Sequence, residues 1–316
     1  MLNKQEDCTS NEIRPLLVKE MLKHSGLVYM VLVVITNITA DAISQCLLET
    51  TTVFLVAMMR GLTMVLLIIP VLLFYSISLK DSLSEWKLLS LRGIASTISV
   101  LTRVAALCFS PLGNVTAVIA VTPIVTALWS WILLAEAVSI NEMGFAVLSA
   151  IGVCLIAQPH TTITDYGTYY GTGFAVFSCI FASLGIVLNR KVSQRDIFIS
   201  PFVQVFYYGA ISTCLNLTAF GISIPTLPQF SFPTWQEWLL LIAVGFASLL
   251  KQTFLTLALK DNEAIYVSTF TYAMSIVAAF VIQYTFFHDI PTLLTLIGSF
   301  LCIFATVGCI TMKLYC

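Results

Sequence analysis

Four charged residues lie inside long apolar runs of this chain: Asp41, Arg60, Arg103 and Lys251. A charged side chain at the centre of a membrane helix costs about 2.5–3.5 kcal/mol on insertion scales. Several Leu or Ile residues, each contributing about 0.3–0.6 kcal/mol, are needed to offset one such charge. These four side chains should therefore face protein or water rather than lipid, and each is a candidate functional residue.

The signs of the four charges suggest a division of roles, because Asp41 can neutralise only one of the three cations. We expect Asp41 to pair with Arg60 as a structural lock, which leaves Arg103 and Lys251 to attract an anion. Asp41, Arg60 and Arg103 each lie roughly 10–12 Å below the same face of the membrane, at the helical rise of 1.5 Å per residue. For Lys251 the alternative is a side chain that reaches up to the membrane surface.

Polar residues recur at helical spacing in six of the apolar runs, which turns one face of each helix away from lipid. The alternative for any single Ser or Thr is a hydrogen bond between packed helices. Taken together, the stripes favour a hydrated central cavity, with Asn37, Gln252 and Tyr272 as further substrate contacts. The stripes include Asn37, Asp41 and Gln45; Arg92, Ser96, Ser99 and Arg103; Ser178, Gly185 and Asn189; Gln204, Tyr208, Ser212 and Asn216; Ser248, Lys251 and Gln252; and Ser268, Tyr272, Ser275 and Gln283.

The composition indicates whether these helices lie in water or in lipid. Of the 316 residues, 59% are hydrophobic and only 10% are charged, whereas a soluble domain carries about 25% charged residues. Such a chain can hide its surface only in a lipid bilayer. The net charge of -1 gives no basic footprint for nucleic acid.

Catalytic and metal-binding motifs are not found in the sequence. The nine cysteines form no CxxC pair and lie mostly inside apolar runs, which favours packing roles over disulfides or metal ligands. There is no HExxH, GxSxG or Walker A motif. We therefore expect no catalytic residues, no metal and no cofactor, and the chain is not predicted to be an enzyme.

The apolar runs predict an all-α membrane protein with ten transmembrane helices, since each run is long enough to cross the hydrocarbon. Basic residues outside the runs lie in alternate segments, which places the N- and C-termini and the segment with Arg92 in the cytosol. The expected spans are 26–48, 53–78, 88–110, 114–135, 143–159, 170–189, 200–222, 235–259, 264–287 and 291–312.

An internal duplication is indicated by a second copy of the pattern of 107–159, about 153 residues later in the chain. At that offset Asp289 corresponds to Glu136, and each acid closes an apolar run, as expected of a structural helix-end residue. Five helices per copy is an odd number, so the second copy would enter the membrane from the opposite side. The expected organisation is a cytosolic tail at 1–25, repeats at 26–159 and 170–312, a linker at 160–169 and a cytosolic end at 313–316.

Two stretches resemble a known family. The sequence TPIVTALWSWILLAEAVSINEMGFAVLSAIGVCLIAQP is similar to the proline-then-glutamate helix pair of EamA-type drug/metabolite transporters, and LLKQTFLTLALKDNEAIYVSTF resembles subfamily G of solute carrier family 35. The resemblance implies two inverted five-helix repeats around a central substrate cavity, with the runs at 143–159 and 291–312 outside. It also implies a general role for Arg60, because the superfamily often has an arginine early in its second helix. The chain departs from the pattern at Asp289, where a glutamate is usual, and at Lys251.

The predicted function is secondary transport of a small anionic metabolite by alternating access, driven by exchange, by a proton carried on Asp41 or by simple facilitation. The alternative is a non-transporting membrane scaffold with the same fold, which would not need Arg103 and Lys251. Either the plasma membrane or an endomembrane such as the ER or Golgi fits. The outer runs at 143–159 and 291–312 are also candidates for a homodimer contact.

Overall fold

A computed structural model describes residues 26–75, 84–135, 140–157, 166–194, 200–223, 233–287 and parts of 293–308. The regular structure within these ranges is helical, without strands. Seven of the helices are long and apolar enough to cross a membrane. They are a first helix at Gly26–Leu47, α2 (Val53–Phe74), α3 (Trp86–Phe109), α7 (Tyr166–Ser193), α8 (Pro201–Ser223), α9 (Trp235–Asp261) and α10 (Ala264–Phe287). Of these, α7 begins inside the segment that was expected to be a linker.

The span expected at 114–135 is divided into α4 (Leu112–Ile119) and α5 (Thr122–Leu134). Pro123 explains the division, because proline has no amide hydrogen to donate to the carbonyl four residues earlier, that of Ile119. The hydroxyl of Thr122 donates to the Ile119 carbonyl instead. The break is therefore compensated within the protein, as a break at membrane depth must be.

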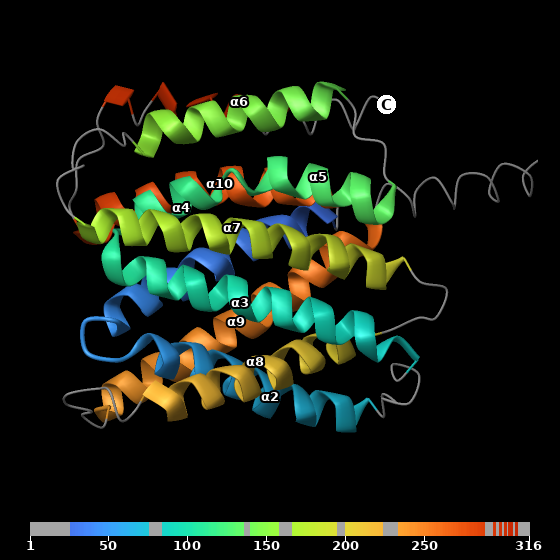
Figure 1. Ribbon diagram of the computed structural model, residues 1–316, viewed down its shortest axis with the longest axis vertical. Helices are drawn as coiled ribbons and strands as arrows, with labels where there is room; N and C mark the ends of the chain where they lie inside the picture. Colours follow the sequence, from blue (N-terminus) through green and yellow to red (C-terminus); the bar gives the residue numbers. More distant parts are fainter. Residues whose placement is uncertain are drawn as a thin grey trace, which may run out of the picture.

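The helices run roughly side by side and are stacked in layers (Figure 1). At one edge lies α6 (Ile140–Ala157), and the ring of Phe145 on α6 lies against Gly308 in the C-terminal segment. The opposite edge is formed by α2 and α8, while α3, α7 and α9 lie between the two edges. The runs that we expected to be outer helices thus lie together at one edge, as far as their residues are described.

Helices from the two halves of the chain pack directly on one another. The most extensive contacts join α3 to α7 and α2 to α8, and α5 packs against both α7 and α10. Glycines allow the close approach of α2 and α8, because a Cβ on Gly61 would lie 2.9 Å from the backbone nitrogen of Thr213. Small residues at helix crossings are the usual means of close packing in membranes.

Helix ends contact one another at both ends of α7. At one end, Arg190 of α7 donates to the carbonyls of Leu259 and Lys260 at 2.7 Å, and Lys191 donates to the Leu133 carbonyl at 3.1 Å. These contacts place positive charge on the C-terminal carbonyls of α9 and α5, where a helix dipole favours it. At the other end, Gly171 at the start of α7 lies against Ser110, just after α3.

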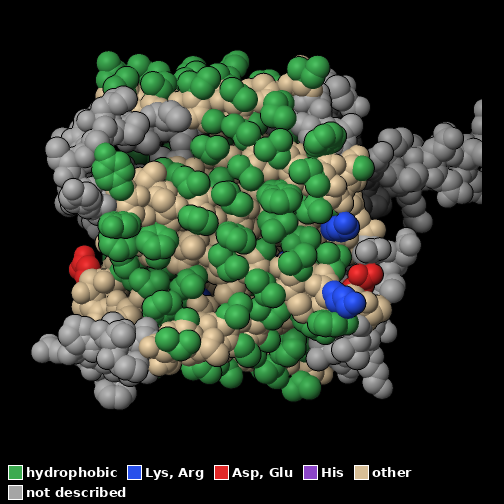
Figure 2. All heavy atoms as spheres, in the orientation of Figure 1, with side chains coloured by type: hydrophobic (Ala, Val, Ile, Leu, Met, Phe, Trp, Pro, Cys, Tyr) green, Lys and Arg blue, Asp and Glu red, His purple; other side chains and the backbone are tan. Residues whose placement is uncertain are grey.

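The outer surface is apolar, as a lipid-facing surface must be. Figure 2 shows hydrophobic side chains over most of the described part of one face, with the clearly visible charged side chains near its two lateral edges. The exposed side chains include large ones such as Leu73, Phe74 and Trp131. Polar side chains are instead abundant in the interior, where they form the site described next.

Candidate functional site

Asp41 of the first helix lies between two arginines. Its Oδ2 is 2.8 Å from Nη1 of Arg103, and its Oδ1 is 3.6 Å from Nη1 of Arg60. All three residues are at most 5% exposed. The arrangement differs from the expected exclusive pairing of Asp41 with Arg60, because the two oxygens of one carboxylate serve two guanidinium groups. Arg103 makes the shorter contact.

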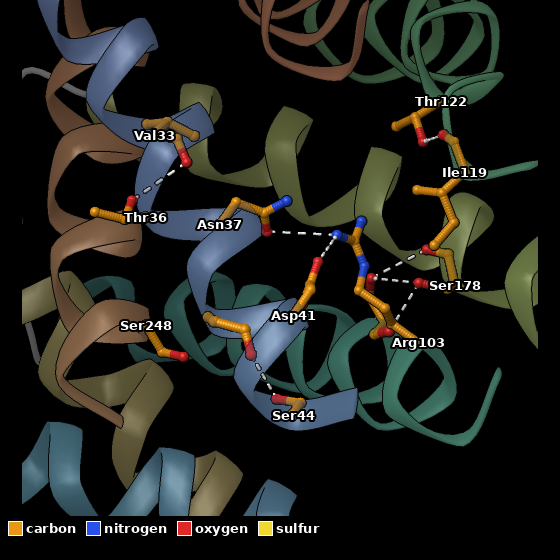
Figure 3. Close-up of polar contacts among 12 residues, drawn as sticks. Val33, Thr36, Asn37, Asp41, Ser44, Arg103, Ile119, Thr122, Ser178 and Ser248 are labelled. Carbon is orange, nitrogen blue, oxygen red and sulfur yellow. Dashed lines mark hydrogen bonds and ion pairs between the residues drawn. The ribbon is translucent and has the colours of Figure 1, made fainter. Parts of the chain in front are cut away.

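Arg103 has two further neighbours from the set expected to contact substrate. Its Nη1 donates to Oδ1 of Asn37 at 3.4 Å, and its guanidinium carbon lies 5.9 Å from the centre of the Tyr272 ring, within cation–π range. Asn37 and Asp41 stand one helical turn apart, so they present their side chains on the same face of the first helix. Figure 3 shows both side chains directed toward Arg103.

Arg60 joins the first helix, α2 and α9. Its Nε donates to Oγ of Ser248 on α9 at 2.9 Å, and its Nη1 donates to Oγ of Ser44 at 3.3 Å. The Ser44 hydroxyl donates a hydrogen bond to the carbonyl of Ala40 at 2.6 Å. Arg60 is thus held by neutral oxygens in addition to its longer contact with Asp41.

Lys251 on α9 completes the cluster. It is partly buried, and it lies within electrostatic range of Asp41, Arg60 and Arg103. It forms no hydrogen bond or ion pair with any residue that the structure describes. Three basic side chains therefore lie within electrostatic range of one carboxylate, and charges in such poorly hydrated surroundings act more strongly than in water.

Gln252, the remaining expected contact, follows Lys251 directly on α9. It is buried beside Tyr208 of α8, with which it interacts through its side chain. Tyr208 is itself within electrostatic range of both Arg60 and Arg92. Through Tyr208, Gln252 therefore connects the surroundings of Arg60 with those of Arg92.

Arg92 was counted among the basic residues of the cytosolic side and also placed on the polar stripe of the span at 88–110, and the structure bears out its place in the helix. It belongs to α3 and is only 2% exposed. Its Nη1 donates to Oε1 of Gln204 and its Nη2 to Oγ1 of Thr256, both at 3.2 Å. The polar stripe that joins Arg92 to Arg103 on one face of α3 was the sequence signal for this burial.

Several predicted residues and segments lie outside the described ranges: Glu136, Asp289, the tail at 1–25 and the end at 313–316. Within the described ranges, no three His, Cys, Asp or Glu side chains are close enough to hold a metal ion together.

Comparison with known proteins adds evidence of ancestry. Residues 24–158 match the EamA-like transporter family. The chain is 28% identical over 267 residues to human solute carrier family 35 member G1. The matched region covers 81% of this chain and 71% of that relative. It is 27% identical over 223 residues to the pseudopaline exporter CntI of Pseudomonas aeruginosa strain UCBPP-PA14, covering 70% and 74% respectively.

A solved crystal structure matches the whole fold. It superposes with a TM-score of 0.73 at 14% sequence identity. The superposed region covers 92% of this chain and 99% of the chain in that structure. At that identity the match concerns the fold alone.

Proposed function

We propose that this chain, an EamA-type membrane transporter that resembles solute carrier family 35 member G, is a secondary transporter that moves a small anionic metabolite by alternating access. Ten spans in two inverted repeats would enclose the site, with both termini in the cytosol. Arg103 and Lys251 would bind the anionic group, Asn37 and Tyr272 would position the solute, and Asp41 with Arg60 would hold the site together.

The excess of positive charge is the observation that carries this proposal. Arg60 and Arg103 contact the carboxylate of Asp41, and Lys251 lies within electrostatic range of it without an ion pair. Buried charges without partners are costly, so a stable protein normally neutralises them. An anionic solute would supply the missing negative charge while it is bound. The partly buried Lys251 has no bonded partner in the described part of the chain, and its ammonium is therefore the group best placed to accept a ligand.

The packing of α2 and α8 supports the two-repeat arrangement. A Cβ on Gly61 would meet Ser212 and Thr213, and a Cβ on Gly209 would meet Met64 and Val65. Gly209, Ser212 and Thr213 of α8 follow Gly61, Met64 and Val65 of α2, respectively, by the same number of positions. Such reciprocal contacts are expected of two copies related by a twofold axis.

A second pair of reciprocal contacts involves α3 and α9, and its α2 and α8 residues are separated by the same number of positions as those of the first pair. A Cβ on Gly93 of α3 would meet Ile211 of α8, and a Cβ on Gly245 of α9 would meet Thr63 of α2. Both glycines begin a similar tetrapeptide, Gly-Ile-Ala-Ser in α3 and Gly-Phe-Ala-Ser in α9. These reciprocal contacts support an internal repeat in which the second half is a copy of the first.

The broken helix supports the placement of the site. Discontinuous membrane helices commonly form the substrate sites of transporters. Here Ala120, at the break between α4 and α5, packs in one cluster with Ala273 and Tyr272 of α10. Since Tyr272 also lies against Arg103, the break adjoins the charged cluster.

Transport by purified protein tests the proposal. Proteoliposomes that contain the full chain would be assayed for uptake of labelled carboxylates and phosphate esters, with neutral sugars and amines as a comparison panel. We expect uptake of at least one anion and a reduction of at least about tenfold in Arg103→Gln and Lys251→Gln, because a hydrogen bond to a charged group contributes about 1.5–3 kcal/mol.

The matched control is Lys87→Gln, which removes an exposed cation near the start of α3 that lies over the ring of Trp86. This variant should transport as the wild type does. Unchanged uptake in both site variants would refute the anion site. Absence of binding and uptake across the whole panel would favour a non-transporting scaffold.

A further inference from the structure

A second buried cation lies apart from the Asp41 cluster. Arg92 and Arg103 are on the same face of α3, three helical turns apart, which corresponds to about 16 Å along the axis. Arg92 is among the largest fully buried side chains of the protein. Its hydrogen bonds go to the neutral side chains of Gln204 and Thr256, and no carboxylate lies within ion-pair distance of it in the described ranges.

The neighbours of Arg92 cannot neutralise it. Thr256 donates its own hydrogen to the carbonyl of Gln252 at 2.8 Å, and its oxygen accepts from both Arg92 Nη2 and Asn189 Nδ2, the latter at 3.3 Å. This oxygen therefore has no further capacity. A guanidinium group has five N–H donors, and two of those of Arg92 are used here.

Asn189 adds an independent sign of an incomplete site. It is 1% exposed, and its Oδ1 is buried without a hydrogen-bond partner. A buried acceptor without a donor is unfavourable and rare in native structures. A ligand that carries a hydroxyl or a protonated acid group could donate to this oxygen while its anionic group binds Arg92.

A row of polar side chains on α8 and α9, called here the polar seam, runs from the surroundings of Arg92 to those of Asp41. Ser248, Gln252 and Thr256 follow one another at one-turn intervals on α9, and Gln204, Tyr208 and Ser212 do the same on α8. Ser248 accepts from Arg60 at one end of the seam and Thr256 accepts from Arg92 at the other. Tyr208 lies within range of both arginines.

We propose that Arg92, with Asn189 and Gln204, forms a second anion-binding site that the transported solute occupies in turn with the Arg103 site. The inference rests on the proposed function, because it assigns the same anionic solute to both positions. The ligand is a small carboxylate or phosphate that also carries a hydrogen-bond donor. In the conformation described here, Ser99 on α3 donates to the Ser178 carbonyl of α7 at 3.0 Å, and the two helices are in contact between the two sites.

Anion binding by the purified full chain in detergent tests this site. Inorganic phosphate and succinate would be titrated against chloride at equal ionic strength, with calorimetry and thermal unfolding as readouts. Arg92→Gln should weaken binding at least tenfold, whereas the anion-free unfolding temperature should stay the same or rise, because an uncompensated buried charge is removed. Arg92→Lys should keep part of the affinity.

Asn189→Asp provides a second, independent test. It places a carboxylate beside Arg92 that competes with the ligand, so anion affinity should fall while the anion-free unfolding temperature rises. Lys87→Gln serves as the control for loss of a cation from the same helix. If Arg92→Gln and Asn189→Asp both bind as the wild type while Arg103→Gln does not, the second site is overturned and the proposed function stands. If the wild type binds neither anion, the second site is overturned, and the uptake panel alone decides the proposed function.

Discussion

Arg103 and Asp41 meet through a 2.8 Å contact between Nη1 and Oδ2, at a position where both side chains are almost fully buried. The contact joins α3 to the first helix, and Arg60 from α2 approaches the other carboxylate oxygen at 3.6 Å. One carboxylate therefore holds three helices of the first half together. This arrangement leads to the first prediction.

Asp41→Asn should destabilise the protein strongly, because it leaves two buried guanidinium groups without a counter-ion. Loss of one partner from a buried ion pair typically costs about 3–5 kcal/mol. Thermal unfolding in detergent measures the loss. The double variant Asp41→Asn with Arg103→Gln should recover part of it, since one of the two unpaired charges is then gone. Equal stability of Asp41→Asn and the wild type would contradict the central role of Asp41.

Gly61→Ala should impair the packing of α2 on α8. The added Cβ would lie 2.9 Å from the backbone nitrogen of Thr213, and a backbone atom cannot move aside as a flexible side chain can. We expect a loss of about 1–3 kcal/mol, as for other overpacked sites, measured by thermal unfolding. Gly221→Ala is the matched control in α8, because nothing lies within 4 Å of its added Cβ. If both variants are equally stable, the close crossing is wrong.

Thr122→Val should destabilise the break between α4 and α5. It removes the hydroxyl that donates to the Ile119 carbonyl, the group that Pro123 leaves without an amide donor. An unsatisfied buried acceptor costs about 1–3 kcal/mol. Thr126→Val is the control, because its hydroxyl donates to the Thr122 carbonyl within regular helix. Both variants would be compared by thermal unfolding, and an equal effect would argue against a special role for Thr122.

Pro123→Ala should extend the helix through the break and slow transport. Alanine provides the amide hydrogen that proline lacks and has a much higher helix propensity. The variant is therefore expected to unfold at the same or a higher temperature than the wild type. Uptake in proteoliposomes should fall, since the break adjoins Tyr272 and the charged cluster. Faster or unchanged uptake would show that the break is not needed for function.

Arg190→Gln should loosen the C-terminal end of α9, because Arg190 donates to the carbonyls of both Leu259 and Lys260. Favourable charge at a helix end and its hydrogen bonds together contribute about 1–2 kcal/mol. Hydrogen exchange of the last turn of α9 would measure the effect locally. Lys87→Gln should leave exchange there unchanged. Equal protection of that turn in Arg190→Gln and the wild type would contradict the contact.

The sequence alone was sufficient for the membrane class and for most helix boundaries, because hydrophobic length is a local property. The starts at Gly26, Pro201, Trp235 and Ala264 lie within one residue of the expected spans or coincide with them. The polar stripes also placed Arg92, Asn189 and Gln204 on inward faces. The break at 120–121 was missed, although Pro123 marks it, because hydropathy averages over such a turn.

Only the tertiary structure decided which side chains the buried charged residues contact. Asp41 could have paired with any of three cations by sequence, and it contacts two of them because the first helix, α2 and α3 converge at one depth. The stripe on 88–110 placed Arg92 on an inward face but named no partners for it, and the structure supplies Gln204 of α8 and Thr256 of α9. Hydropathy and spacing act along one helix, whereas a buried charge takes its partners from helices distant in the chain. Only the packing of those helices therefore determines which charges are neutralised.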